Sequence, residues 1–271
     1  MDPPRAKELS REEMSRSRVD VTCRQSSTGT GAARRSSLPD VHLVLLGKLD
    51  LTVAAHSSSL IHNAQRVVAF LALQNGPVSR VIAARTLWPD VTEAQASAKL
   101  RSVLWRLQQH CRYVVESMPR VLRLHPYVHV DFYDSIHVAA RLLDRSAVLT
   151  PQDLSVAMRV NLSDDLLPYW HDESWLAPEQ ERFHQLRLHA LERLCDQLIS
   201  AEWYGAAVDA ALSAVRADSF RESARAGLIR AYLAEGNHYH ALAEYDSYRK
   251  LLTEELGMEP STQLSSLIDG H

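Results

Sequence analysis

The sequence predicts two folded domains of different class, a small α+β domain over residues 41–132 and an all-α domain over residues 133–271. From residue 41 onwards, short alternating β-type runs enclose three helical patterns, whereas from residue 133 the apolar spacing is helical almost throughout. The charge changes at the same position, because residues 41–132 carry 10 Lys/Arg against 5 Asp/Glu and residues 133–271 carry 12 against 22. A chain of 271 residues that is 46% hydrophobic has enough apolar material for both cores.

The first 40 residues are polar and end in the stretch "SSTGTGAARRSS". This composition predicts a disordered N-terminal tail over residues 1–40, since it buries too little apolar surface to order itself. Its Gly-x-Gly neither follows a strand nor opens a helix, so a phosphate-binding loop is excluded. No apolar run is long enough for a membrane span or a secretory signal, and three widely spaced cysteines favour the reducing cytoplasm.

The α+β domain begins with strands and continues with three helices. The stretch "VHLVLLGKLDLTV" predicts two strands around Gly47, and "SSSLIH" predicts a weak third. A helix capped by Asn63 and ended by Gly76 follows, then one capped by Ser79 and ended by Pro89. After the third helix, "RYVVES" and "RVLRLH" predict a small hairpin that turns at Met118 and Pro119, and "YVHVDF" alternates again.

The third helix, residues 93–111, has two different faces. Its apolar residues recur at helical spacing and predict a face packed on the core: Leu100, Val103, Leu104 and Leu107. The other face combines cations, amide and hydroxyl groups with Trp105, a large side chain to leave in water. Taken alone, this face also fits a solvated surface, with Trp105 covered by the hairpin.

Strands, three helices and a hairpin are the element order of a winged helix, whose third helix enters the DNA major groove while the hairpin wing touches the backbone. Arg101 is then expected to bind a guanine edge, Lys99 and Arg106 to neutralise phosphates, and Trp105 to lie against the groove wall or a thymine methyl. The full set of predicted DNA-binding residues is Lys99, Arg101, Ser102, Trp105, Arg106, Gln108, Arg120 and Arg123.

The second domain is predicted to be helical from start to end. Helix start signals occur at Asp134 or Ser135 and at Thr150 with Pro151, and a long helix follows from about Ala177. The segments "EWYGAAVDAALSAVRAD" and "GNHYHALAEYDSYRKLL" align at a spacing of 35, with Tyr204 over Tyr239 and Ala206 over Ala241. That period is similar to the tetratricopeptide helical hairpin, whose surface groove suits protein contacts.

Two stretches carry a family resemblance. "DLLPYWHDESWLAPEQERFHQLRLHALERL" and "ALAEYDSYRKLLTEELGMEPSTQL" look like the signature stretches of the bacterial transcriptional activator domain, and residues 41–131 resemble the OmpR-type winged helix that precedes it. The pairing is similar to the SARP family, the Streptomyces antibiotic regulatory proteins, in a short form. The sequence of the wing differs from that of many family members, because "MPRVLRLHPYVHVD" lacks the Gly-Tyr pair that they have in the last hairpin.

The resemblance implies an activator of a secondary-metabolite (antibiotic) gene cluster. Such proteins bind direct repeats near the promoter as two copies side by side, and they recruit RNA polymerase through its sigma factor and the C-terminal domain of its alpha subunit. The resemblance implies no catalytic residue, cofactor, metal or membrane partner, and it places the protein in the cytoplasm, on the nucleoid.

Two other classes of function fit parts of the sequence. A helical-repeat adaptor that does not bind DNA would explain the second domain, but it has no use for Lys99, Arg101 and Arg123 on one side of the first. A metal or acid–base site could use His125, His129 and His137 or the "WHDE" stretch at His171. On one extended strand, however, His125 and His129 would be about 13 Å apart, too far to share an ion. Cys111 and Cys195 fall on apolar helix faces and are expected to be core residues.

Overall fold

The structure of the protein is a computed structural model that describes residues 39–74 and 76–269. All of the expected N-terminal tail except residues 39 and 40 lies outside this range. Within it, the α+β domain and the all-α domain occur in the predicted order, so the predicted fold class is confirmed. No described helix is long and apolar enough to cross a membrane.

The first sheet contains four strands in the order β3-β2-β1-β7. Strands β1 (Val41–Val44) and β2 (Asp50–Val53) pair antiparallel on either side of Gly47, as predicted. The third strand was misplaced, because β3 is His56–Ser57 and "SSSLIH" instead leads into the first helix. Strand β7 (Val128–Val130) lies parallel to β1, so the "YVHVDF" run joins this sheet and not the hairpin.

Three helices follow, and they match the predicted ones apart from their ends. Helix α1 is His62–Leu73, α2 is Arg80–Leu87 and α3 is Glu93–His110. Asn63 does not cap α1, because the helix begins one residue before it. The N-cap residue is Ile61, and its side chain makes no capping hydrogen bond. Helix α3 has a reciprocal cap, in which Thr92 Oγ1 accepts from Gln95 N and Gln95 Oε1 accepts from Thr92 N.

The wing is a three-stranded sheet in the order β4-β6-β5. Strands β5 (Val115–Ser117) and β6 (Val121–Leu124) form the predicted hairpin across Met118 and Pro119. The unpredicted strand β4 (Val78–Ser79) comes from the loop between α1 and α2 and pairs with β6. The wing is therefore tied to the start of α2.

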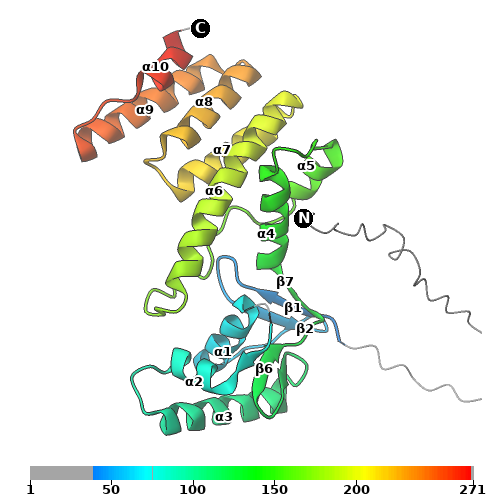
Figure 1. The fold of residues 1–271 in the computed structure, drawn as a ribbon. Helices are drawn as coiled ribbons and strands as arrows, with labels where there is room; N and C mark the ends of the chain where they lie inside the picture. The colour runs from blue at the N-terminus through cyan, green and yellow to red at the C-terminus, as the bar shows by residue number, and fades with distance from the viewer. Residues whose placement is uncertain (1–38, 75, 270–271) are drawn as a thin grey trace, which may run out of the picture. The chain divides into compact units, whose positions relative to one another are not determined.

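The second domain consists of α4 (Asp131–Leu143), α5 (Pro151–Ala157), α6 (Ala177–Ser200), α7 (Tyr204–Ala217), α8 (Glu222–Glu235), α9 (His238–Leu256) and α10 (Thr262–Asp269). Helix α4 starts three residues before Asp134, directly after β7. Thr150 and Asp153 cap α5 as a pair, and Ala177 starts α6 as predicted. Helices α6 to α9 pack in succession, each against the next (Figure 1).

The internal repeat has a period of 34 residues, one fewer than the predicted 35. Helices α7 and α9 start 34 residues apart, and the fully buried Ala207 and Ala241 take equivalent positions. Ala206, which was aligned with Ala241, is only half-buried. The matching tyrosines produced the error, because the structure places Tyr239 one residue later in its helix than Tyr204 in its own.

The core of the winged helix includes side chains from beyond residue 160. Leu166, Leu167, Leu176 and Phe183 belong to the same buried cluster as β1 and the three helices α1 to α3. Backbone hydrogen bonds join the two segments, since Leu167 N donates to Leu45 O at 3.0 Å and Gly47 N donates to Asp165 O at 2.8 Å. Gly47 has a φ of +79°, and a Cβ there would meet Asp164 Oδ2 at 3.1 Å, so any other residue would be strained in this turn.

Cys111 and Cys195 are buried core residues, as predicted. Burial raises the pKa of both thiols, that of Cys195 to about 12. Since the thiolate is the reactive form, we expect a Cys23→Ser variant to resist alkylation by iodoacetamide at pH 8 while folded and to take up two equivalents once unfolded in urea. Mass spectrometry measures the uptake, and rapid modification of the folded variant would contradict the burial of these thiols.

Candidate nucleic-acid interface

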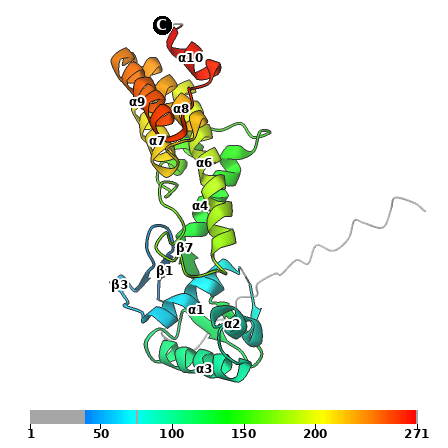
Figure 2. The ribbon, with the colours of Figure 1, turned by 90° about the vertical axis from the view of Figure 1, so that its left-hand side faces the viewer.

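Helix α3 has one face in the core and one in solvent. Its buried residues pack against α1 and α2: Ala96, Leu100, Val103, Leu104 and Leu107. In both views α3 lies at the edge of the molecule, with α1 and α2 on one side of it (Figures 1 and 2). The core therefore fixes which face of α3 is available to a ligand.

The structure brings the six predicted DNA-binding residues of α3 onto its solvent face. All six are exposed: Lys99, Arg101, Ser102, Trp105, Arg106 and Gln108. The wing does not cover Trp105, whose exposed fraction is 61%. Among the described residues, Lys99 and Arg101 have no carboxylate within ion-pair distance. Their charges are thus available to an external anion.

The two predicted wing arginines have different surroundings. Arg120 is exposed in the turn between β5 and β6. Arg123 on β6 lies directly across from Glu116 on β5 and donates from Nε to its carboxylate at 2.6 Å. Arg123 lowers the pKa of Glu116, chiefly through this hydrogen bond. Arg120 is therefore the freer of the two cations, and Arg123 also stabilises the hairpin.

Two further arginines support or extend the interface and were not among the predicted residues. Arg80 begins α2, and its guanidinium donates to Met118 O at 2.8 Å and to Ser117 Oγ at 2.5 Å. It thereby holds the wing turn. A cation in the first turn of a helix interacts unfavourably with the helix dipole. The position of Arg80 in the sequence could therefore have indicated that its side chain has another partner. Arg112, exposed just after α3, lies over the Tyr113 ring at 4.7 Å.

The structure does not bring the histidines considered as metal ligands together. His125 lies in the turn between β6 and β7, so it does not share a strand with His129 as expected. His129 instead pairs with Asp134 at 2.8 Å. Across the described part of the chain, no three His, Cys, Asp or Glu side chains are grouped so that they could hold a metal.

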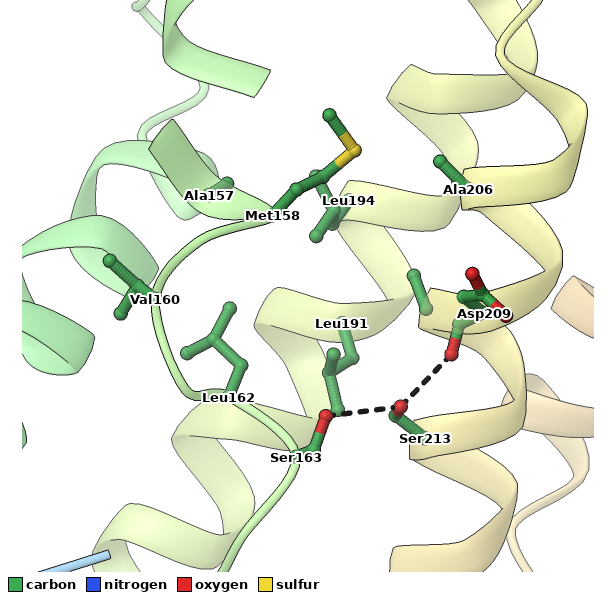
Figure 3. Close-up of a pocket in the computed structure, with 11 residues that line it drawn as sticks. Ala157, Met158, Val160, Leu162, Ser163, Leu191, Leu194, Ala206, Asp209 and Ser213 are labelled. Atoms are coloured by element: carbon green, nitrogen blue, oxygen red, sulfur yellow. Dashed lines mark hydrogen bonds between the residues drawn. The ribbon is translucent and has the colours of Figure 1, made fainter. Parts of the chain in front are cut away.

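A small pocket of about 170 Å³ lies between residues 157–163, α6 and α7 (Figure 3). Its lining is largely apolar, and its polar side chains are Ser163, Asp209 and Ser213. Ser163 donates to Ser213 Oγ at 3.1 Å, and Ser213 donates to the backbone oxygen of Asp209 at 2.9 Å. No histidine, lysine or cysteine lines the pocket to activate either hydroxyl.

Glu173, from the "WHDE" stretch, lies at the junction between the winged helix and the second domain. Its exposed fraction is 9%, and Arg66 Nη2 on α1 donates to its Oε2 at 3.0 Å. Trp175 Nε1 donates to the same oxygen at 2.5 Å, while Arg66 also donates to Leu87 O at the end of α2. Glu173 thus has a structural role, and its neighbour His171 is exposed.

A second charged group at the junction is centred on Asp165. The buried guanidinium of Arg187 donates to Asp165 Oδ1 at 2.8 Å and to Ser163 O. The Nδ1 atom of His184 lies 3.0 Å from Asp165 Oδ1. Burial alone would raise the pKa of Asp165, but its hydrogen bonds with Arg187 and His184 outweigh burial and lower it. The carboxylate therefore stabilises the fold above its ordinary pKa of 3.8, and this contribution is lost as the pH falls through the lowered value.

We expect Asp165→Asn to destabilise the protein at pH 7, because it leaves the buried Arg187 without its anion. The difference from the wild type should shrink as the pH falls below about 4, because the Asp165 carboxyl of the unfolded wild-type chain then binds a proton, and it should be smallest below the lowered pKa of the folded protein. Urea unfolding of the wild type and the variant at pH 7 and below pH 4 measures this difference in stability. An equal difference at the two pH values would contradict the ion pair.

The comparisons with known proteins agree with this architecture. Residues 160–270 match the family model of the bacterial transcriptional activator domain. The fold is similar to that of EmbR of Mycobacterium tuberculosis, solved in complex with a low-affinity phosphopeptide, with a TM-score of 0.61 and 21% sequence identity over 85% of this chain. The chain spans 64% of that structure's length, and no curated protein matches it. The C-terminal part of the chain is thus similar to the bacterial transcriptional activator domain, and the fold of the chain is similar to that of EmbR.

Proposed function

We propose that the protein is a sequence-specific DNA-binding activator of a secondary-metabolite (antibiotic) gene cluster. The observation that carries this proposal is the outer face of α3, where Lys99 and Arg101 are exposed without a carboxylate partner among the described residues, within a domain of net charge +5. A local positive field of this kind attracts the phosphate backbone although the whole chain has a net charge of −3.

The residues have separate tasks in this proposal. Arg101 binds the O6 and N7 atoms of a guanine, and Ser102 and Gln108 bond bases or phosphates. Lys99 and Arg106 neutralise phosphates on the groove walls. Arg120 contacts the backbone from the wing, and Arg123 does so while it remains paired with Glu116.

The domains and partners follow from the same proposal. Residues 41–132 bind DNA, and residues 133–271 serve as the activator domain. Two copies lie side by side on direct repeats, and the acidic second domain faces basic surfaces of RNA polymerase at its sigma factor and alpha C-terminal domain. The protein acts on the nucleoid in the cytoplasm, requires no cofactor, and is controlled by its amount.

In vitro transcription with RNA polymerase holoenzyme tests activation directly. The template carries the promoter of the chain's own gene cluster, and the matched control protein is Arg101→Ala, which changes one exposed side chain of α3. We expect the wild type to increase the transcript and the variant to lose most of the increase. Equal transcript with and without the wild-type protein would overturn the activator function and leave the adaptor interpretation.

A further inference from the structure

Trp105 is the one exposed tryptophan of the chain. All five tryptophans fall within the described residues, and the other four are buried or half-buried: Trp88, Trp170, Trp175 and Trp203. An indole that is 61% exposed leaves a large apolar surface in water. Such a surface in the middle of a proposed ligand-binding face favours an apolar group on the ligand.

Helical geometry places Trp105 at the centre of the outer face. A helix turns about 100° per residue, so Ala98 and Trp105 point almost directly away from the buried stripe of α3. Arg101 lies on one flank of this line, and Lys99 and Arg106 lie on the other. The centre of the face is therefore apolar and its flanks are positive.

Along the centre of the outer face, the turns of α3 that precede Trp105 carry only short side chains. Ala94, Ala98 and Ser102 are exposed there, and none extends beyond a methyl or hydroxymethyl group. The backbone of α3 can thus approach the floor of the groove closely, while the flanking cations meet the phosphate walls. A central indole faces the base edges in this arrangement, not the sugar–phosphate wall.

We infer that Ala98 and Trp105 contact the C5-methyl groups of thymines. This inference rests on the proposed DNA-binding function. The thymine methyl is the apolar group that the major groove offers, and alanine and aromatic side chains pack against it. The two residues are two helical turns apart, about 10 Å along the axis, which corresponds to about three base-pair steps. The preferred site then has thymines about three steps apart at the centre of each repeat.

The test removes the methyl groups one at a time. The full-length wild-type protein first selects its preferred sequence from a library of random duplexes. Each thymine of that sequence is then replaced by deoxyuridine, which differs only by the absent C5-methyl, and the affinity is measured by fluorescence anisotropy. We expect a loss of about fourfold at the thymine that Trp105 contacts, the effect of one buried methyl-sized group.

The same substitutions are measured with three variants. Trp105→Ala should make the affected position insensitive to the missing methyl, whereas Trp105→Phe should retain part of the sensitivity. The matched control is Ile82→Ala, which removes another exposed apolar side chain of the domain, 57% exposed on α2, and should leave the sensitivity intact.

The outcomes separate the inference from the proposed function. Methyl sensitivity that disappears with Trp105→Ala supports the inference. An enriched sequence whose deoxyuridine forms bind as tightly as the parent, or lose the same affinity with Trp105→Ala, overturns the inference alone. Failure to enrich any sequence overturns the proposed function and the inference with it.

Discussion

Replacing Glu173 by alanine is expected to lower the free energy of unfolding by about 3–5 kcal/mol. The change removes a carboxylate that lies between the two domains and accepts hydrogen bonds from Arg66 and Trp175. The Arg66 side chain is only 15% exposed, so its charge would remain buried without an anion. The cost of an uncompensated buried charge is the dominant cause of the loss.

Urea or thermal unfolding monitored by circular dichroism measures this change. The matched control is Lys250→Ala, which breaks an exposed ion pair with Glu254 whose N–O distance is 3.8 Å, and its effect should stay within about 0.5 kcal/mol. Because the buried cluster of the winged helix also includes Leu166, Leu167, Leu176 and Phe183 of the second domain, we expect both domains to unfold in one transition. A Glu173→Ala protein as stable as Lys250→Ala would show that the junction does not depend on this pair.

Replacing Arg101 by alanine should cost about 1–3 kcal/mol of specific DNA affinity and relax the preference at one base pair. Arg101 is exposed on α3 and has no carboxylate partner among the described residues, so the variant should fold normally. Lys99→Ala should instead weaken binding to all sequences by a similar factor, since a phosphate contact carries no sequence information.

Anisotropy titrations on the selected duplex and on its single-base variants measure both changes. Lys99→Ala should also reduce the dependence of log affinity on log salt by about one unit. If both variants bound every duplex like the wild type, the solvent face of α3 would not be the DNA-contacting surface.

Two features that the local sequence determines were predicted correctly. The apolar spacing of α3 determines which side is buried, and with it the six residues that the structure places on the solvent face. The start of α5 at Thr150 and Pro151 was likewise predicted from the local sequence, and the structure adds Asp153 as the capping partner of Thr150.

The features that depend on distant partners were not predicted. Strand β4 has two residues and exists because β6 pairs with it, so it leaves no alternation in the sequence. Arg80 acts on a turn 37 residues away, and Glu173 pairs with Arg66 at a separation of 107 residues. Helix α1 lacks a side-chain cap, which made the polar Asn63 the natural but wrong choice for its start.

One titration tests most directly whether the basic domain binds DNA in a sequence-specific manner. Fluorescence anisotropy of the full-length protein is measured on promoter fragments of its own gene cluster and on scrambled DNA across a salt series. We expect tight binding to one fragment with two copies bound, and an affinity that falls steeply as salt rises because the basic face releases counterions. Equal affinity for promoter and scrambled DNA at every salt concentration would contradict the account.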